Sequence, residues 1–220
     1  KLDNGKAGTG IVLFGSHDVR LHDNLAVENA LNNHEQVIPV FLWSQQSQWE
    51  VTGALEVVLQ EALLSLAESL ENFGLRLVCR NSKDGGCQDL LDIAKETGAT
   101  TVYFNREHTP ESRTREANQK KALQEAGISV VETQSSLLYD PDLIELETGF
   151  HGGHWGTLMP FLKSCKKKFG DPRRPTPTHE TFRLLQESKG PAEWPVSVGV
   201  KGLNLAMVTG KDKWDVPIRE

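Results

Sequence analysis

The chain alternates short apolar runs with longer segments in which apolar residues recur every three or four positions. Five apolar runs predict β-strands: residues 10–14, 37–43, 75–79, 100–104 and 128–132. Four helical patterns lie between them: residues 25–32, 54–73, 88–96 and 110–126. This alternation predicts an α/β fold with a five-stranded, parallel, doubly wound (Rossmann-like) sheet flanked by helices, for which we expect the strand order 3-2-1-4-5.

Local signals support these elements. Asp23 or Asn24 is a natural N-cap for the first helix, and Thr109-Pro110-Glu111 is a strong start for the fourth helix. Pro39 lies near the start of the second strand, where a missing N–H is least costly, so the strand prediction is retained. In the longest helix, one apolar stripe is expected to face the sheet: Leu55, Val58, Leu59, Ala62, Leu66, Leu70 and Phe73.

The patterning divides the chain into three parts. Residues 1–9 are polar and are expected to be disordered. Residues 10–170 form the α/β domain, with a further helix expected at 157–169. Residues 171–220 hold six of the ten prolines and show no strong period, so we interpret them as a linker leading toward a domain outside this sequence.

Composition narrows the possible partners. The chain has 220 residues, 38% of them hydrophobic, and a formal net charge of -6, which disfavours a polyanion as the general partner. The one basic cluster is interpreted as a solvated helix end, with nucleic-acid contact as the alternative: Lys163, Lys166, Lys167, Lys168, Arg173 and Arg174.

Cysteine usage and apolar run lengths bear on the cellular environment. The three cysteines show no C-x-x-C spacing, which favours a reducing, intracellular compartment; the sequence does not distinguish cytoplasm, nucleus and plastid. No apolar run is long enough to span a bilayer. Residues 1–6 do not resemble a signal peptide or a native start, so we interpret the chain as a fragment or a processed form.

Two polar loops mark the candidate site. Residues 15–24 follow the first strand and residues 105–108 follow the fourth. In the order 3-2-1-4-5 these strands are neighbours at the point where strand order reverses, so both loops face one cleft. The helix start after residue 108 can hold an anion or the polar edge of a ligand. A capped connection without a ligand is an equally weighted alternative.

Other constellations have simpler interpretations. The His17-Asp18 and His22-Asp23 pairs resemble metal ligands, but we favour a helix cap and a polar loop, and no metal is expected. His151 and His154 flank Gly-Gly and are interpreted as a turn. No nucleophile elbow, P-loop or dinucleotide-binding glycine motif is present, so no catalytic residue is assigned.

Several spaced motifs resemble one family. They follow one another in the family's order: Arg20-Leu21-His22-Asp23-Asn24, Val37-Ile38-Pro39-Val40-Phe41, Leu75-Arg76-Leu77-Val78-Cys79-Arg80, Val102-Tyr103-Phe104-Asn105-Arg106 and Met159-Pro160-Phe161-Leu162-Lys163. Together they resemble the N-terminal α/β domain of DNA photolyases and cryptochromes, over residues 10–170.

The resemblance implies a function in blue-light chemistry. In this family the α/β domain holds a light-harvesting antenna, methenyltetrahydrofolate or a deazaflavin. FAD, the DNA-binding surface and light-driven repair or signalling belong to a following helical domain, which this sequence lacks. The chain alone is therefore expected not to be catalytic, and to reach DNA only through such a domain. The expected antenna contacts are Phe14, Asp18, Arg20, Phe41, Asn105, Glu107 and His108.

Departures from the family pattern keep other hypotheses open. Gly15 stands where the family has Arg, and Trp43-Ser44 replaces an Asp-Pro. Thr109 replaces a Glu that contacts the antenna in folate-binding members; Glu107 would stand in only after a loop shift. One alternative is a chromophore-free scaffold or binding module fused to another domain, and another is a nucleotide-binding protein of the wider α/β class.

Overall fold

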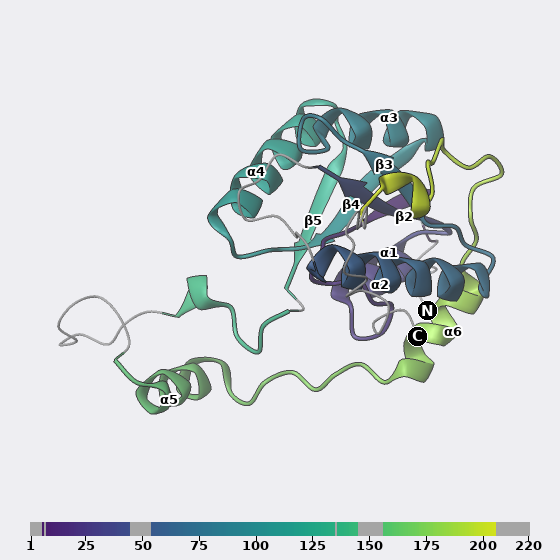
Figure 1. The fold of residues 1–220 in the computed structure, drawn as a ribbon. Coiled ribbons are helices and arrows are strands. Elements are labelled where there is room, and N and C mark those ends of the chain that lie inside the picture. Colours follow the sequence, from purple (N-terminus) through teal and green to yellow (C-terminus); the bar gives the residue numbers. More distant parts are fainter. Residues whose placement is uncertain (1–5, 7, 45–53, 135, 145–155, 206–220) are drawn as a thin grey trace.

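A five-stranded parallel sheet forms the centre of the molecule (Figure 1). The computed structural model describes residues 6, 8–44, 54–134, 136–144 and 156–205. The strands lie in the order β3-β2-β1-β4-β5, which confirms the predicted fold class and strand order. Their bounds are β1 Thr9–Phe14, β2 Gln36–Trp43, β3 Val78–Asn81, β4 Ala99–Asn105 and β5 Ser129–Thr133.

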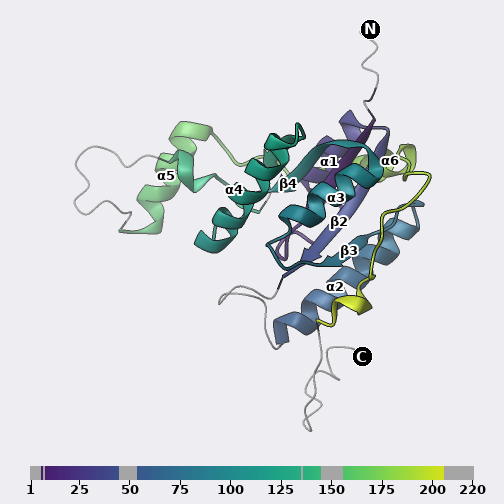
Figure 2. The same ribbon diagram turned by 90° about the horizontal axis from the view of Figure 1, so that it is seen from above.

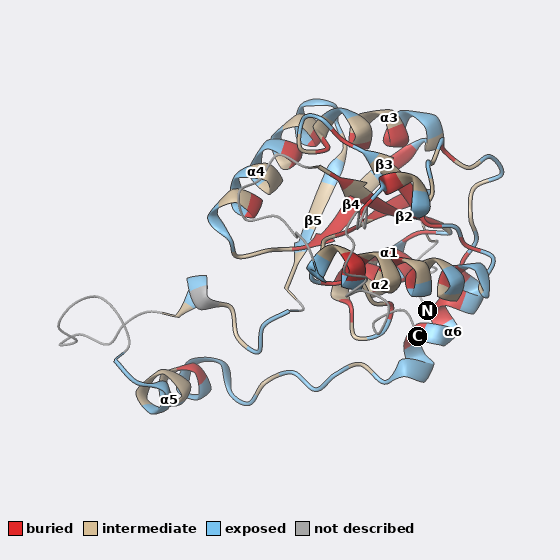
Figure 3. Ribbon diagram, viewed as in Figure 1, coloured by how far each residue is buried: buried red, intermediate tan, exposed pale blue. Residues whose placement is uncertain are grey.

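Helices cover both faces of the sheet (Figures 1 and 2). Helices α1 (Leu25–Asn33) and α2 (Ala54–Glu71) lie on one face, and α3 (Cys87–Thr97) and α4 (Pro110–Glu125) lie on the other. Two apolar clusters fill the spaces between the layers, and the strands and inner helix faces are the buried parts in Figure 3. The sheet is therefore held rigidly from both sides.

The helix starts follow the predicted capping chemistry. Asn24 Oδ1 accepts a hydrogen bond from the Val27 N–H at 3.3 Å, so Asn24 is the N-cap of α1. Thr109 Oγ1 accepts from the Ser112 N–H at 3.2 Å and caps α4. Helix α4 buries few side chains, as its polar sequence predicts.

The third strand differs from its prediction. Leu75 and Leu77 are buried as a strand would require, but only Val78–Asn81 pair with β2. The start of β2 is occupied instead by a late segment of the chain, where the Val37 N–H donates to the Lys189 carbonyl at 3.1 Å. Pro39 lies two residues after Val37 and faces the gap between Lys189 and β3. Its missing N–H is therefore tolerated inside a central strand.

The apolar stripe of α2 is rotated from the predicted one. Val57 and Leu63 are fully buried, whereas Leu55 and Val58 are 62% and 51% exposed. The prediction for Leu55 and Val58 was wrong because Val57 and Leu59 form the inward face at the start of α2. Leu55 instead lines a cavity described below.

Two further helices follow the sheet. Helix α5 (Leu158–Phe169), predicted at 157–169, lies away from the sheet (Figures 1 and 2), and Cys165 is its buried residue. Helix α6 (Thr178–Glu187) was not predicted; its Leu184 and Leu185 join the cluster that includes α1. Two short 3-10 turns, η1 (Pro141–Leu143) and η2 (Lys201–Leu203), complete the described elements.

A late segment also covers the open edge of β3. The Val198 N–H donates to the Cys79 carbonyl at 2.9 Å, and the Cys79 N–H donates to Ser197 Oγ at 2.8 Å. Covering an edge strand prevents pairing with other chains. Residues 1–5 and 7 of the expected disordered segment, the His151–His154 turn and residues 206–220 lie outside the described residues.

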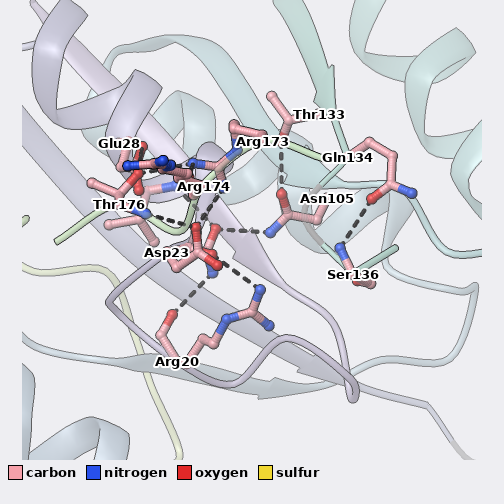
Figure 4. A network of polar contacts seen from close by, with 12 residues as sticks. Arg20, Asp23, Glu28, Asn105, Thr133, Gln134, Ser136, Arg173, Arg174 and Thr176 are labelled. Carbon is pink, nitrogen blue, oxygen red and sulfur yellow. Dashed lines mark hydrogen bonds and ion pairs between the residues drawn. The ribbon is translucent and has the colours of Figure 1, made fainter. Parts of the chain in front are cut away.

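Asp23 fastens the segment before α6 to the loop after β1 (Figure 4). Its carboxylate pairs with the Arg173 guanidinium and accepts from the Thr176 N–H at 3.1 Å. Partial burial opposes ionisation, but these two partners hold the pKa of Asp23 below its ordinary value. The residue adopts a left-handed conformation, with φ of 48°, which is unfavourable for a side chain with a Cβ.

Replacing Asp23 with alanine should release this segment. We expect the free energy of unfolding to fall by about 2 kcal/mol, because two hydrogen bonds to a charged group are lost. Amide hydrogen exchange should rise in residues 173–187 and stay unchanged in α3. Replacing Glu187, which forms an exposed ion pair with Arg183, with glutamine is the control. Equal exchange in the two variants would contradict the fastening role.

Candidate functional site

A cavity of about 160 Å³ opens at the carboxyl ends of β1, β2 and β4. Phe14 lines it from β1 and Gly15 from the residue after that strand, Phe41 and Trp43 line it from β2, and Asn105 from β4. Further walls come from the loops after these strands and from the starts of α2 and α4. This is the edge at which doubly wound sheets bind ligands, next to the switch between β1 and β4.

Asn105 joins three elements beside the cavity. Its Nδ2 donates to Asp18 Oδ2 at 2.6 Å and to Asn24 Oδ1 at 2.8 Å. Its Oδ1 accepts from Thr133 Oγ1 at 2.7 Å, so the end of β5 is tied to the same side chain (Figure 4). Asn105 is 5% exposed and Asp18 is 4% exposed, so the network is closed to water.

Asp18 fixes the loop after β1. Its Oδ1 accepts from the Gly15 N–H at 2.6 Å, and its Oδ2 accepts from Asn105. Burial raises the pKa of Asp18 to about 6, although the hydrogen bonds from Asn105 and Gly15 favour the ionised form. The nearby Glu107 carboxylate adds to the rise.

A second acidic group lies on the α4 side. Glu107 Oε2 pairs with Arg115 Nη2 at 3.0 Å, and the Glu107 N–H donates to Glu116 Oε1 at 2.9 Å. Burial raises the pKa of Glu116 to about 7, the hydrogen bond from Glu107 opposes the rise, and the Glu107 carboxylate adds to it. Glu107, Arg115 and Glu116 all line the cavity, whose α4 wall carries more acidic than basic groups.

Three buried polar atoms of the cavity lining have no hydrogen-bond partner among the residues that the structure describes. They are Trp43 Nε1, Ser44 Oγ and Glu107 Oε1. Buried polar groups are nearly always satisfied in folded proteins, and each one left alone costs about 1–3 kcal/mol. One donor, one acceptor and one hydroxyl around a shared space fit the complementary polar edge of a bound molecule.

The structure brings together some of the predicted site residues. Phe14, Phe41, Asn105 and Glu107 line the cavity, and Asp18 lies directly behind it, bonded to Gly15 and Asn105. Arg20 and His108 do not line it. Arg20 Nη2 donates to the Asp23 carbonyl at 3.0 Å, and His108 Nδ1 lies 3.4 Å from Arg113 Nη2.

Other lining residues were not in the predicted set. Trp43 and Ser44 had been noted only as departures from a family pattern, and Arg115 and Glu116 lie in the second turn of α4. Trp43 ends a buried strand, which is a signal available in the sequence. The inward position of Arg115 and Glu116 was not readable, because α4 has almost no apolar period to show its orientation.

Thr109 has the capping role that the sequence predicted, and Glu107 supplies the carboxylate of this loop. Thr109 is occupied as the cap of α4. Glu107, two residues earlier, places a carboxylate against Gly15 in the cavity wall.

Two classes of site find no support in the part of the chain that the structure describes. No group of three or more His, Cys, Asp or Glu side chains is arranged to hold a metal ion there. Among the described helices, none has both the length and the apolar character needed to cross a membrane.

The fold and the cavity define a class: a doubly wound α/β domain with a cavity at its switch point, lined by both apolar and polar side chains. Residues 11–180 match the family model for DNA photolyase, so the chain belongs to the DNA photolyase family.

Three similar proteins show the breadth of this family. A deoxyribodipyrimidine photo-lyase of Agrobacterium fabrum is 28% identical over 93% of this chain and 40% of its own length. Cryptochrome-1 of Arabidopsis thaliana is 30% identical over 78% of this chain and 24% of its own. The crystal structure of a bacterial class III photolyase from Agrobacterium tumefaciens superposes with a TM-score of 0.77 at 30% identity, over 95% of this chain and 40% of that one.

The chain therefore spans well under half the length of these relatives. The family model covers all but the first two residues of the sheet, together with the chain as far as residue 180.

Proposed function

We propose that this domain holds a light-harvesting antenna chromophore and places it for a flavin located elsewhere in the complete protein. The observation that carries the proposal is the cavity at the carboxyl ends of β1, β2 and β4, where polar atoms of Trp43, Ser44 and Glu107 lack a partner within the described part of the chain. Membership of the DNA photolyase family supports light as the input. Light-driven repair or blue-light signalling would follow from the flavin-bearing part.

The domain's contribution is position and polarity. The photochemistry belongs to the chromophore and the flavin. Phe14, Phe41 and Trp43 supply apolar lining, and Glu107 supplies a carboxylate oxygen that has no partner among the described residues. Such a lining fixes the orientation of a planar ring, on which efficient energy transfer depends.

The cavity encloses one ring system rather than a whole chromophore. Its volume of about 160 Å³ is near that of a cavity that accepts benzene, about 150 Å³, and below the range for drug-sized ligands, about 300–1,000 Å³. The remainder of the chromophore would lie along the rim, where Leu55 is exposed. In this proposal residues 10–170 form the antenna domain, and residues 171–220 lead toward the partner domain.

The absorption spectrum of the purified, full-length protein tests the proposal. We expect a near-ultraviolet or blue band that belongs to neither protein nor flavin, and we expect it to vanish when Trp43 is replaced with alanine. Colourless protein that takes up neither methenyltetrahydrofolate nor a deazaflavin on titration would refute antenna binding. The chromophore-free scaffold, which the small cavity also fits, would then be favoured.

A further inference from the structure

The segment that carries η1 and α5 lies outside the layers of the α/β domain. We call its described residues, 136–144 and 156–170, the arm. Among the residues that the structure describes, neither of the two apolar clusters of the domain includes a residue of the arm. Helix α5 lies away from the sheet in both ribbon views (Figures 1 and 2). Burial in these clusters therefore does not determine where the arm lies.

A cluster of arginines and aspartates joins η1 to the α/β domain. Arg106, which follows β4, pairs with Asp140, and its Nη2 lies 3.7 Å from Asp142 Oδ2. Arg113 Nη2, on α4, donates to both carboxylate oxygens of Asp142 at 2.8 Å. The hydrogen bond from Arg113 holds the pKa of Asp142 below its ordinary value, so this carboxylate is charged at neutral pH. We call this cluster the first clasp.

The chain after α5 is joined to the domain by contacts of the same kind. The Arg173 guanidinium pairs with the Asp23 carboxylate, which also accepts from the Thr176 N–H (Figure 4). Thr176 Oγ1 in turn donates to Glu28 Oε2 at 3.1 Å. We call this group the second clasp. The arm is thus fastened on both sides by an arginine that pairs with an aspartate.

Both clasps adjoin one buried point of the domain. Asp23 directly precedes Asn24, and Arg106 directly follows Asn105. The Asn105 amide donates to Asn24 Oδ1 at 2.8 Å, and both asparagines are buried. We therefore expect the anchoring residues to keep their places when the arm leaves them.

The arm has internal contacts of its own. Tyr139 Oη donates to the Gly170 carbonyl at 2.9 Å, and its ring centroid lies 6.2 Å from that of Phe169. Lys168 Nζ donates to the Leu143 carbonyl at 2.5 Å. These contacts join η1 and its neighbours to the last turn of α5. The two described parts of the arm are therefore expected to move as one body.

Ion pairs at a surface respond to salt in a way that apolar packing does not. The Arg113 and Asp142 side chains are 43% and 41% exposed, and Arg173 is 46% exposed. Such pairs are individually weak, and about 1 M salt, at which the Debye length is about 3 Å, screens them. The apolar clusters that hold the sheet do not depend on charge. Salt should therefore loosen the arm and leave the sheet intact.

We propose that the arm is a strap, which the two clasps fasten to the α/β domain and which opens without unfolding that domain when the clasps are broken. Opening would change where α5 presents Leu158 and Met159, which are 71% and 57% exposed. The strap is a conformational device in which charge decides the position of α5. This inference is independent of the proposed antenna function.

Distance measurements between two spin labels in the full-length protein test the inference. Labels carried by non-natural amino acids replace Met159 in α5 and Gln124 in α4, two exposed positions, so the native cysteines are not used. The wild-type protein should give one narrow distance distribution at low salt. The triple variant Asp23→Asn, Asp140→Asn, Asp142→Asn should add a longer distance and raise the ratio of open to closed arm about tenfold, because several exposed or partly exposed ion pairs are lost together.

Raising NaCl to about 1 M should have the same effect on the wild-type protein, without any substitution. Asn at position 23 tolerates the left-handed backbone found there, so the variant keeps its fold. Asp171→Asn is the matched control, because Asp171 pairs with Lys166 of α5 and not with the α/β domain. Its distance distribution should equal that of wild type.

Amide hydrogen exchange in β1 and β4 should stay equally slow in all variants and at both salt concentrations. An unchanged distance distribution in the triple variant or at high salt would overturn the inference, since other contacts would then hold the arm. Faster exchange in β1 and β4 whenever the arm opens would also overturn it, because the arm would then belong to the fold of the domain.

Discussion

Replacing Asn105 with alanine is expected to lower the free energy of unfolding by about 3 kcal/mol, because a buried charged group loses its partner. The change removes hydrogen bonds from the Asn105 amide to Asp18, Asn24 and Thr133. Among the described contacts, the Asp18 carboxylate then keeps one hydrogen bond, from the backbone N–H of Gly15. Chemical denaturation at pH 7 measures the effect.

The matched control is Asn32→Ala, at an exposed position in α1. It should change stability by less than about 0.5 kcal/mol, as surface substitutions usually do. The loss at Asn105 should shrink at pH 5, because protonated Asp18 no longer presents an unpaired buried charge. A loss equal to that of the control would contradict the central place of Asn105 in the site.

The second large effect is a dependence of stability on pH at Glu116. Its folded-state pKa is about 7, against an ordinary value of 4.5. Between these values the folded state binds more protons than the unfolded state, so this group makes stability fall as pH rises from about 4.5 to 7. Asp18 acts in the same direction between about 3.8 and 6.

Replacing Glu116 with glutamine should remove this contribution. Its amide oxygen can still accept from the Glu107 N–H. We expect the variant to be more stable than wild type by about 1–2 kcal/mol at pH 8, less than the full shift implies because the carboxyl is partly exposed. At pH 4 the two should be equal, since the wild-type carboxyl is then neutral. A stability difference of the same size at both pH values would exclude titration of Glu116 as its cause.

The sheet was predictable because its strands are buried on both faces, and such strands appear in the sequence as short continuous apolar runs. Runs such as Ile11–Phe14 and Val102–Phe104 are buried on both faces, as strands of a parallel sheet must be. The third strand was placed too early because Leu75 and Leu77 are buried without pairing to β2. Their place beside β2 belongs to Lys189, a contact over long sequence separation that no local pattern shows.

Helix α6 shows a different limit. Prolines before and after it made residues 171–220 resemble a linker, yet Leu184 and Leu185 pack against α1. Helix α6 has ten residues, and its two leucines are adjacent, so the segment is too short to show a helical repeat of apolar positions. Tertiary packing, together with the Asp23 contacts to Arg173 and Thr176, stabilises this helix more than its own propensity does.

The candidate site was partly predictable. Switch-point geometry placed the loops after the first and fourth strands at one edge, and the family resemblance added Phe14 and Phe41. Phe14, Phe41 and Asn105 now line one cavity. The place of Glu107 was not determined by the sequence, because it depends on the space left by Gly15 in another loop. Arg20 and Asp23 belong to the same motif as Asn24 but hold the chain together instead of facing the cavity.

The most direct test of the account is to locate a bound chromophore by NMR. Uniformly labelled protein would be titrated with methenyltetrahydrofolate while amide and indole signals are followed. We predict that the largest shifts fall at Gly15, at the Trp43 indole N–H and at Glu107, with none in α5. Shifts confined to other surfaces, or no shifts at all, would contradict a chromophore site at the carboxyl ends of β1, β2 and β4.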